Sequence, residues 1–114
     1  MNTGAELITG ERRRQIDEKG WDAEHDDEHT EGELALAAIC YATPRAIFVK
    51  DDRATAIIFD DPWPWEDKWD KRYRYETGNT LPAPETYTQA ERISFLVMAG
   101  AMIAAEIDHL QRQK

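Results

Sequence analysis

The chain has 114 residues, a length that suits one domain with a modest hydrophobic core. Its 23 acidic and 14 basic residues give a formal net charge of −9, which argues against a general nucleic-acid binder because phosphate backbones need clustered lysine and arginine. The same charge argues against binding to anionic membranes. The single cysteine, Cys40, excludes an internal disulfide framework and fits a reducing cytoplasm.

Neither a signal peptide nor a membrane span is expected. Residues 1–10 lack a long apolar core. The longest apolar run, Phe95 to Ala105, is much shorter than a membrane-spanning helix. These features predict a cytoplasmic protein without membrane contact.

The first half of the chain predicts two helices separated by an acidic segment. The first should run from Glu11 to Lys19 and stop at Gly20, with Trp21 folding back on the helix end. Residues 22–31 are mostly acidic, so they should form a loop or a frayed helix. A capping box of Thr30 and Glu33 should then begin a helix over 32–42.

The second half predicts a β-hairpin and the longest helix. The β-branched and aromatic segments 45–50 and 55–60 flank a turn-like tetrapeptide, and the resulting hairpin should pack on the helices because a lone hairpin is marginally stable. A capping box of Thr88 and Glu91 begins a helix that extends to about Arg112. Gly100 in its middle costs about 1 kcal/mol against alanine, which predicts a close crossing at that point.

Three of the four tryptophans lie in one Trp/Pro-rich segment, residues 62–69. The prolines exclude a regular helix or a central strand, so the segment should be rigid and extended or turning. It either closes the helical core or forms a platform for a ligand. Trp21 and Trp69 are expected in the core. Trp63 and Trp65 share one face of an extended chain and can line a groove, with Arg72 at its rim and Arg14 adding charge.

The acidic segment contains His25-x-x-Glu28-His29, the arrangement of inverted zinc proteases. Histidine and carboxylate side chains are the ligands that zinc prefers. If a metal is bound, its ligands would be His25, Asp26, His29 and Glu33. The alternative is a solvated acidic loop whose histidines cap or pair, and we expect no tightly bound metal or cofactor.

The clustered carboxylates also resemble those of all-α nucleotide pyrophosphohydrolases, which hold Mg²⁺ with two acidic motifs on helices. The residues that would correspond are Glu24 with Asp27, Glu28 with Glu31, and Glu106 on the long helix. The resemblance implies metal-dependent hydrolysis of a nucleotide, for which Mg²⁺ needs several oxygen ligands.

Most of the chain resembles a family of small bacteriophage and prophage proteins, which implies a bacterial host. The residues that carry this resemblance are Gly20-Trp21, Glu24-His-Asp-Asp27, Gly32-Glu-Leu34, Pro62-Trp-Pro-Trp65 and Ala99-Gly-Ala101. The family implies no particular activity.

The chain also resembles the RyR repeat, a small helical module of ryanodine receptors and of bacterial and phage proteins. The matching residues are Gly20-Trp21, Asp26-Asp27, Pro64-Trp65, Arg92 and Gly100. The module lacks a counterpart of the segment Gly32 to Phe59. The resemblance implies binding of a nucleotide-derived ligand.

The predicted fold is one mainly α domain over residues 1–114, with about three helices, one β-hairpin and the Trp/Pro-rich segment closing the core. Residues 1–8 are expected to be loosely ordered. The predicted function is a non-enzymatic phage-type accessory protein that binds a small nucleotide-like ligand or a host protein. A metal-dependent nucleotide pyrophosphohydrolase and an acidic protein–protein interaction module without ligand stay open, as does a homo-oligomeric state.

Overall fold

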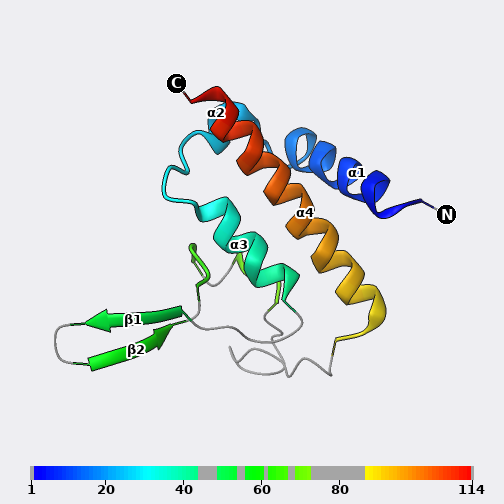
Figure 1. Ribbon diagram of the computed structural model, residues 1–114. Helices are drawn as coiled ribbons and strands as arrows, with labels where there is room; N and C mark the ends of the chain where they lie inside the picture. Colours follow the sequence, from blue (N-terminus) through cyan, green and yellow to red (C-terminus); the bar gives the residue numbers. More distant parts are fainter. Residues whose placement is uncertain are drawn as a thin grey trace.

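The computed structural model describes residues 2–43, 49–53, 56–60, 62–66, 69–72 and 87–113. The described elements are α1 (Gly4–Asp17), α2 (Ala23–Asp26), α3 (Glu33–Ala42), β1 (Val49–Arg53), β2 (Ala56–Asp60) and α4 (Gln89–Arg112). α4 is the central element, and α1, α2 and α3 each pack against it (Figure 1). The prediction of a small, mainly helical domain is confirmed.

α1 begins two turns earlier than expected and ends at Asp17, two residues before the predicted Lys19. A capping box joins Thr3 and Glu6, so residues expected to be loosely ordered form the first turns of the helix. Glu6 accepts the Thr3 backbone N–H in return, which lowers the pKa of its carboxyl group. Beyond the helix, Gly20 has a φ of +71°, and the Trp21 amide returns to the carbonyl of Gln15 at 2.9 Å. Glycine permits this left-handed backbone, and the turn aims Trp21 back along the helix.

The two later helices differ in how they begin. α4 begins with the predicted capping box of Thr88 and Glu91 and ends at Arg112, so that prediction is confirmed. α3 begins after Gly32, whose φ is +75° and which offers no side-chain cap, so the predicted Thr30–Glu33 capping box is wrong. The Glu33 carboxylate instead accepts the amide of Glu31. The glycine's left-handed turn replaces the side-chain cap as the start of the helix.

The core lies between α3 and α4. Its buried members are Ala37, Ala38, Tyr41, Phe95, Ala99 and Met102, with Trp63 and Trp65 packed against them. On the other side of α4, α1 crosses at Gly100, where an added Cβ would lie 2.5 Å from Cδ1 of Ile8. The predicted close crossing is therefore confirmed, and the crossing helix is α1.

The acidic segment is tied to the helices on both sides. Arg12 of α1 binds the fully buried carboxylate of Asp26 at 2.7 Å. Asp27 accepts hydrogen bonds from Arg112 at 2.7 Å and from His109 Nδ1 at 2.9 Å, both on α4. The bonds from Arg112, and secondly those from His109, lower the pKa of Asp27 to about 2. These residues therefore anchor α2 instead of forming a solvated loop.

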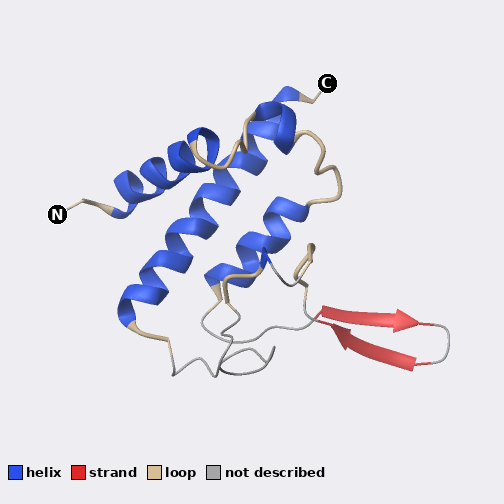
Figure 2. Ribbon diagram, turned by 180° about the vertical axis from the view of Figure 1, so that it is seen from behind, coloured by secondary structure: helices blue, strands red, loops and turns tan. Residues whose placement is uncertain are grey.

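β1 and β2 pair antiparallel, with Val49 opposite Asp60 and Arg53 opposite Ala56. The pair stands away from the helices, and within the described residues it contacts none of them (Figure 2). The expectation that the hairpin packs on the helices is not met in this part of the chain.

Among the described helices, α4 has the length and hydropathy of a membrane span. It contains 24 residues, and its most apolar 18-residue window has a mean hydropathy of 1.5. The expectation of no membrane span rested on the unbroken apolar run from Phe95 to Ala105, and it stays a prediction. One-third of this window is buried against the rest of the protein.

Candidate functional site

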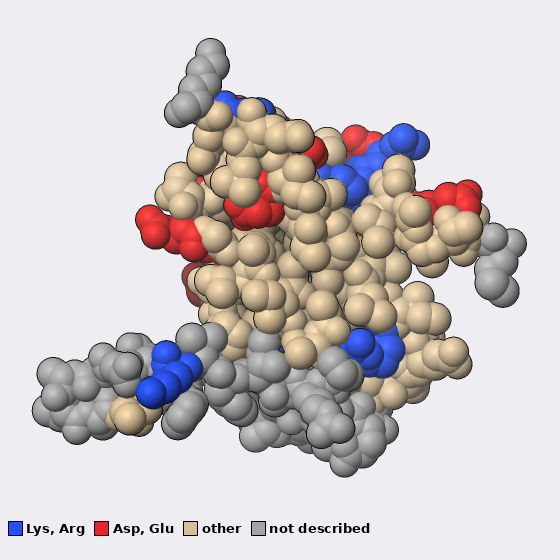
Figure 3. All heavy atoms as spheres, in the orientation of Figure 1, with Lys and Arg blue, Asp and Glu red and all other residues tan. Residues whose placement is uncertain are grey.

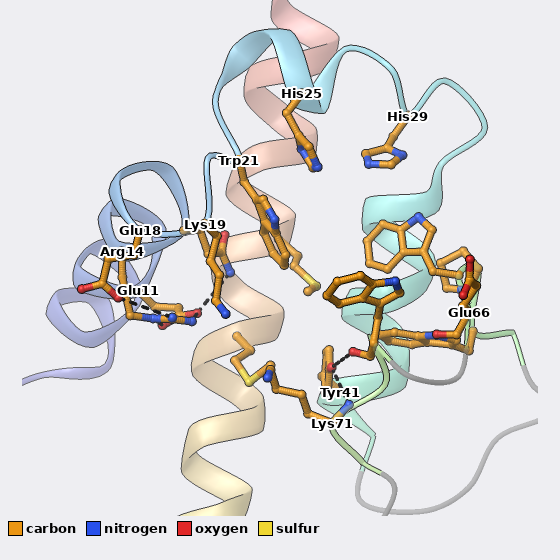
Figure 4. A pocket seen from close by; sticks show the side chains of 17 residues that line it. Glu11, Arg14, Glu18, Lys19, Trp21, His25, His29, Tyr41, Glu66 and Lys71 are labelled. Atoms are coloured by element: carbon orange, nitrogen blue, oxygen red, sulfur yellow. Dashed lines mark hydrogen bonds and ion pairs between the residues drawn. The ribbon is translucent and has the colours of Figure 1, made fainter. Parts of the chain in front are cut away.

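A cavity of about 760 Å³ lies between α1 and α3, which do not contact each other (Figure 4). α4 contributes Met98 and Met102 to its lining, and the Trp/Pro-rich segment contributes Trp63 and Trp65. Trp21 and Trp69 also line it, so all four tryptophans of the chain meet here. The volume suits a small organic molecule, because ligand pockets usually measure about 300–1,000 Å³.

Six aromatic rings follow one another around this cavity and form what we name the aromatic belt. Its members in spatial order are Trp21, His25, His29, Trp65, Trp63 and Tyr41. The first two rings are parallel, with centroids 5.8 Å apart and planes 4° apart. The later neighbours are 5.1–5.5 Å apart and tilted or edge-to-face. Such contacts hold each ring against the next, so the belt presents a preformed apolar wall.

Local bonds fix the belt's polar members. His25 Nδ1 lies 3.2 Å from Asp26, and His29 Nδ1 lies 3.1 Å from Glu33. Trp63 donates its indole N–H to the carbonyl of Glu66 at 3.1 Å. These bonds restrict the rotation of the three rings and so help to keep the belt in one arrangement.

Two polar atoms in the lining are buried and have no hydrogen-bond partner within the described structure. They are Oε1 of Gln15, a residue only 1% exposed, and Nε1 of Trp65. The amide nitrogen of Gln15 donates to Glu11 at 3.3 Å, which leaves the oxygen as the free end. An unpaired buried polar atom costs about 1–3 kcal/mol, so this acceptor and this donor gain from a partner that enters the cavity.

The charges around the cavity are unevenly paired. Arg14 makes two bonds of 2.7 Å to Glu11, which lower the pKa of the Glu11 carboxyl group. Lys19 and Lys71 extend into the cavity from opposite walls (Figure 4). Neither lysine forms an ion pair in the described part of the chain. The lining contains three basic and three acidic side chains, the acidic ones being Glu11, Glu18 and Glu66, so its formal charge is balanced while that of the whole protein is −9.

Arg72, expected at the rim, is instead 4% exposed. Its guanidinium binds Asp70, with Nη2 to Oδ2 at 2.8 Å, and lies 5.7 Å from the centre of the Trp63 ring. The acidic neighbour two positions earlier draws the arginine inward, and the exposed Lys71 enters the cavity in its place. Arg72 therefore supports Trp63 from behind.

The structure also corrects the prediction for Trp69. This residue is 61% exposed and lies among the cavity's lining residues, so it is not a core tryptophan. Trp21 packs against the core and also lines the cavity. The neighbouring Lys71 amide donates to the Tyr41 hydroxyl at 3.0 Å, which ties this stretch to α3. Burial raises the pKa of the Tyr41 phenol, which therefore stays protonated.

Of the five predicted ligand-binding residues, four line the cavity and Arg72 does not. The sequence interpretation missed Lys19, Lys71, Tyr41 and the two belt histidines. An aromatic residue at the last turn of α3 and lysines beside Trp21 and Trp69 were the available signals.

The possible metal ligands do not converge. Across the described residues, no group of three or more histidine, cysteine or acidic side chains is placed to hold a metal ion. α2 ends at Asp26, so His29 does not follow His25 on one helix. Asp26 is bound by Arg12, and the two histidines contribute their rings to the aromatic belt.

Comparison with known proteins adds no further constraint. No protein-family model, no curated protein and no solved structure matches this chain.

Proposed function

We propose that the cavity binds a small ligand that combines a flat heteroaromatic ring with negative charge, as a nucleotide-derived molecule does. The protein would be a phage-type accessory protein of a bacterial cytoplasm that binds this ligand without transforming it. The observation that carries the proposal is the meeting of all four tryptophans with Lys19 and Lys71 around one cavity. In this proposal the Trp/Pro-rich segment closes the cavity, and the preceding hairpin leads the chain to it.

The belt supplies the affinity for a flat ring. Stacking of one base on an aromatic side chain is worth about 1–3 kcal/mol, and it tolerates different bases because each has a π-face. Met98 and Met102 add polarisable, adaptable surface beneath the rings. This composition favours a planar aromatic ligand over a sugar or a peptide.

The unpaired polar atoms supply the orientation. Gln15 Oε1 needs a donor and Trp65 Nε1 needs an acceptor. The edge of a nucleobase carries donors and acceptors side by side. Both protein atoms are closed off from solvent, so the ligand would reach them after small rotations of these side chains.

The two lysines would hold the negative charge of the ligand. Lysine is a common ligand of phosphate and acts as a point charge on a flexible stem. Lys19 and Lys71, which form no ion pair with any residue that the structure describes, suit a phosphate held between opposite walls. The described lining contains no serine, threonine or cysteine that could serve as a nucleophile, which favours binding over catalysis.

The experiment is calorimetric titration of the purified protein with mono-, di- and cyclic nucleotides and the matching uncharged nucleosides. Lys71→Ala should weaken nucleotide binding roughly tenfold to 150-fold, the range that corresponds to a charge-assisted hydrogen bond, and should leave nucleoside binding unchanged. Arg13→Ala is the matched control, because it removes an exposed positive charge that does not line the cavity. Absence of binding by every compound, or equal losses in both variants, would refute the proposal.

A further inference from the structure

The outer face of α4 carries a row of half-exposed aliphatic side chains. They are 45–55% exposed, and they are Ile93, Leu96, Ile103, Ile107 and Leu110. These positions are separated by three, seven, four and three residues and share one side of the helix, and Gly100, in the gap of seven, is covered by Ile8 of α1. We name this row the outer α4 face.

This face is separate from the cavity. Met98 and Met102, which line the cavity, lie on the opposite side of the same helix. Ile39 of α3, itself 49% exposed, adds to the apolar surface exposed on the helices. Figure 3 shows the centre of this side of the molecule without charged side chains, while acidic and basic groups lie towards its margins. A continuous uncharged surface of this kind usually marks an interaction site.

We propose that the outer α4 face binds the same face of a second copy of this chain, with the two helices antiparallel about a two-fold axis. The two ends of the row match when the helix is reversed. Reversal places Ile93 opposite Leu110 and Leu96 opposite Ile107 of the other copy, and Ile103 next to the contact between Ile8 and Gly100 of the other copy. A two-fold contact requires this self-complementarity, whereas an unrelated partner does not.

The area of the outer α4 face and the net charge of the chain bear on whether a second copy binds there. The five residues of the outer α4 face and Ile39 together expose on the order of 400–500 Å² of apolar surface. A standard interface buries about 800 Å² per partner, of which a little over half is apolar, so the exposed apolar area is about the amount that such an interface needs. Each copy carries a net charge of −9, so two copies repel each other, and contact through an uncharged face adds no further contact between like charges. Salt screens that repulsion, and the dimer should therefore tighten as ionic strength rises.

The test is sedimentation velocity of the full chain from about 1 to 200 µM, at low and high salt. Wild-type protein should form dimers, and Ile103→Glu should raise the dissociation constant at least tenfold. Ile57→Glu is the matched control, because this isoleucine is 58% exposed on β2 and lies outside the face. Circular dichroism of both variants checks that they remain folded.

Disulfide trapping tests the orientation. The double variant Ile93→Cys/Leu110→Cys should form a cross-linked dimer, and Leu110→Cys alone should not, because antiparallel helices hold the two copies of position 110 roughly 26 Å apart. The native Cys40 is buried, so wild-type protein, which contains this cysteine alone, serves as the control for background cross-linking. A monomer at every concentration, a dimer unaffected by Ile103→Glu, cross-linking through position 110 alone, or a monomer that instead binds uncharged lipid vesicles would each overturn the proposal.

Discussion

The contact between α1 and α4 can be tested with the substitution Gly100→Ala, because the Ile8 side chain decides whether this change raises or lowers the free energy of unfolding. An alanine Cβ at Gly100 would lie 2.5, 2.8 and 3.3 Å from Cδ1, Cγ1 and Cγ2 of Ile8. All three atoms belong to the same side chain. The destabilisation caused by Gly100→Ala in the wild-type protein therefore depends on how far the Ile8 side chain can move away from the new methyl group.

The expected magnitude combines two opposing effects. Alanine is favoured over glycine in a helix interior by about 1 kcal/mol. Overpacking a close contact costs about 1–3 kcal/mol. The net change in wild-type protein should lie between zero and about 2 kcal/mol of destabilisation. In an Ile8→Ala background the clash is absent, so Gly100→Ala should stabilise by about 1 kcal/mol.

The assay is urea denaturation of wild type, both single variants and the double variant, which gives the coupling energy between the two positions. Gly10→Ala is the control, because Gly10 lies within α1 and an added Cβ there meets no atom within 4 Å. This control should stabilise by about 1 kcal/mol in both backgrounds. Equal stabilisation by Gly100→Ala and Gly10→Ala in wild-type protein would show that α1 does not approach α4 as described.

Three further predictions concern the charged anchors and the exposed tryptophan. The pKa of Asp27 lies at about 2, below its ordinary 3.8, so the carboxylate stabilises the protein fully above about pH 5 and loses this effect as the pH falls through about 2. Asp27→Asn should therefore lower the melting temperature at pH 7 and flatten its decline between pH 5 and 2; an unchanged decline would contradict this. Asp70→Ala should cost about 1–3 kcal/mol in chemical denaturation, because it removes the buried carboxylate that binds the Arg72 guanidinium, and a loss below about 0.5 kcal/mol would show that this pair adds little stability. Trp69→Ala should change stability little but weaken nucleotide binding in calorimetry, because Trp69 is largely exposed yet lines the cavity; unfolding of this variant would place the residue in the core.

The sequence predicts those features that depend on nearby residues. The capping box of Thr88 and Glu91, the stop at Gly20 and the end of α4 near Arg112 each depend on a few neighbouring side chains. The start of α3 was misassigned because Thr30 and Glu33 fit a capping pattern, while Gly32 provides a left-handed turn closer to the helix. More than one local sequence pattern can indicate the start of the same helix, and the sequence alone does not show which of them the structure uses.

The candidate site could be predicted only in part, because its geometry depends on contacts between distant segments. The sequence shows that Trp63 and Trp65 share a face, but the belt also needs Trp21, which α1 positions, and His29, which follows α2. The inward turn of Arg72 depends on its pairing with Asp70 under Trp63. The alternation of side chains along an extended segment does not show which of the neighbouring residues Lys71 and Arg72 is buried.

The most direct test of ligand binding in the cavity is a ¹H–¹⁵N NMR titration that follows the four tryptophan indole N–H signals. The titrant is the tightest-binding nucleotide of the calorimetric panel. We predict that all four signals shift and saturate with one dissociation constant, and that Trp65 shifts most because its Nε1 gains its first hydrogen-bond partner. Signals that do not move, or a shift of exposed Trp69 alone without saturation, would contradict the proposal that the tryptophans surround one binding site.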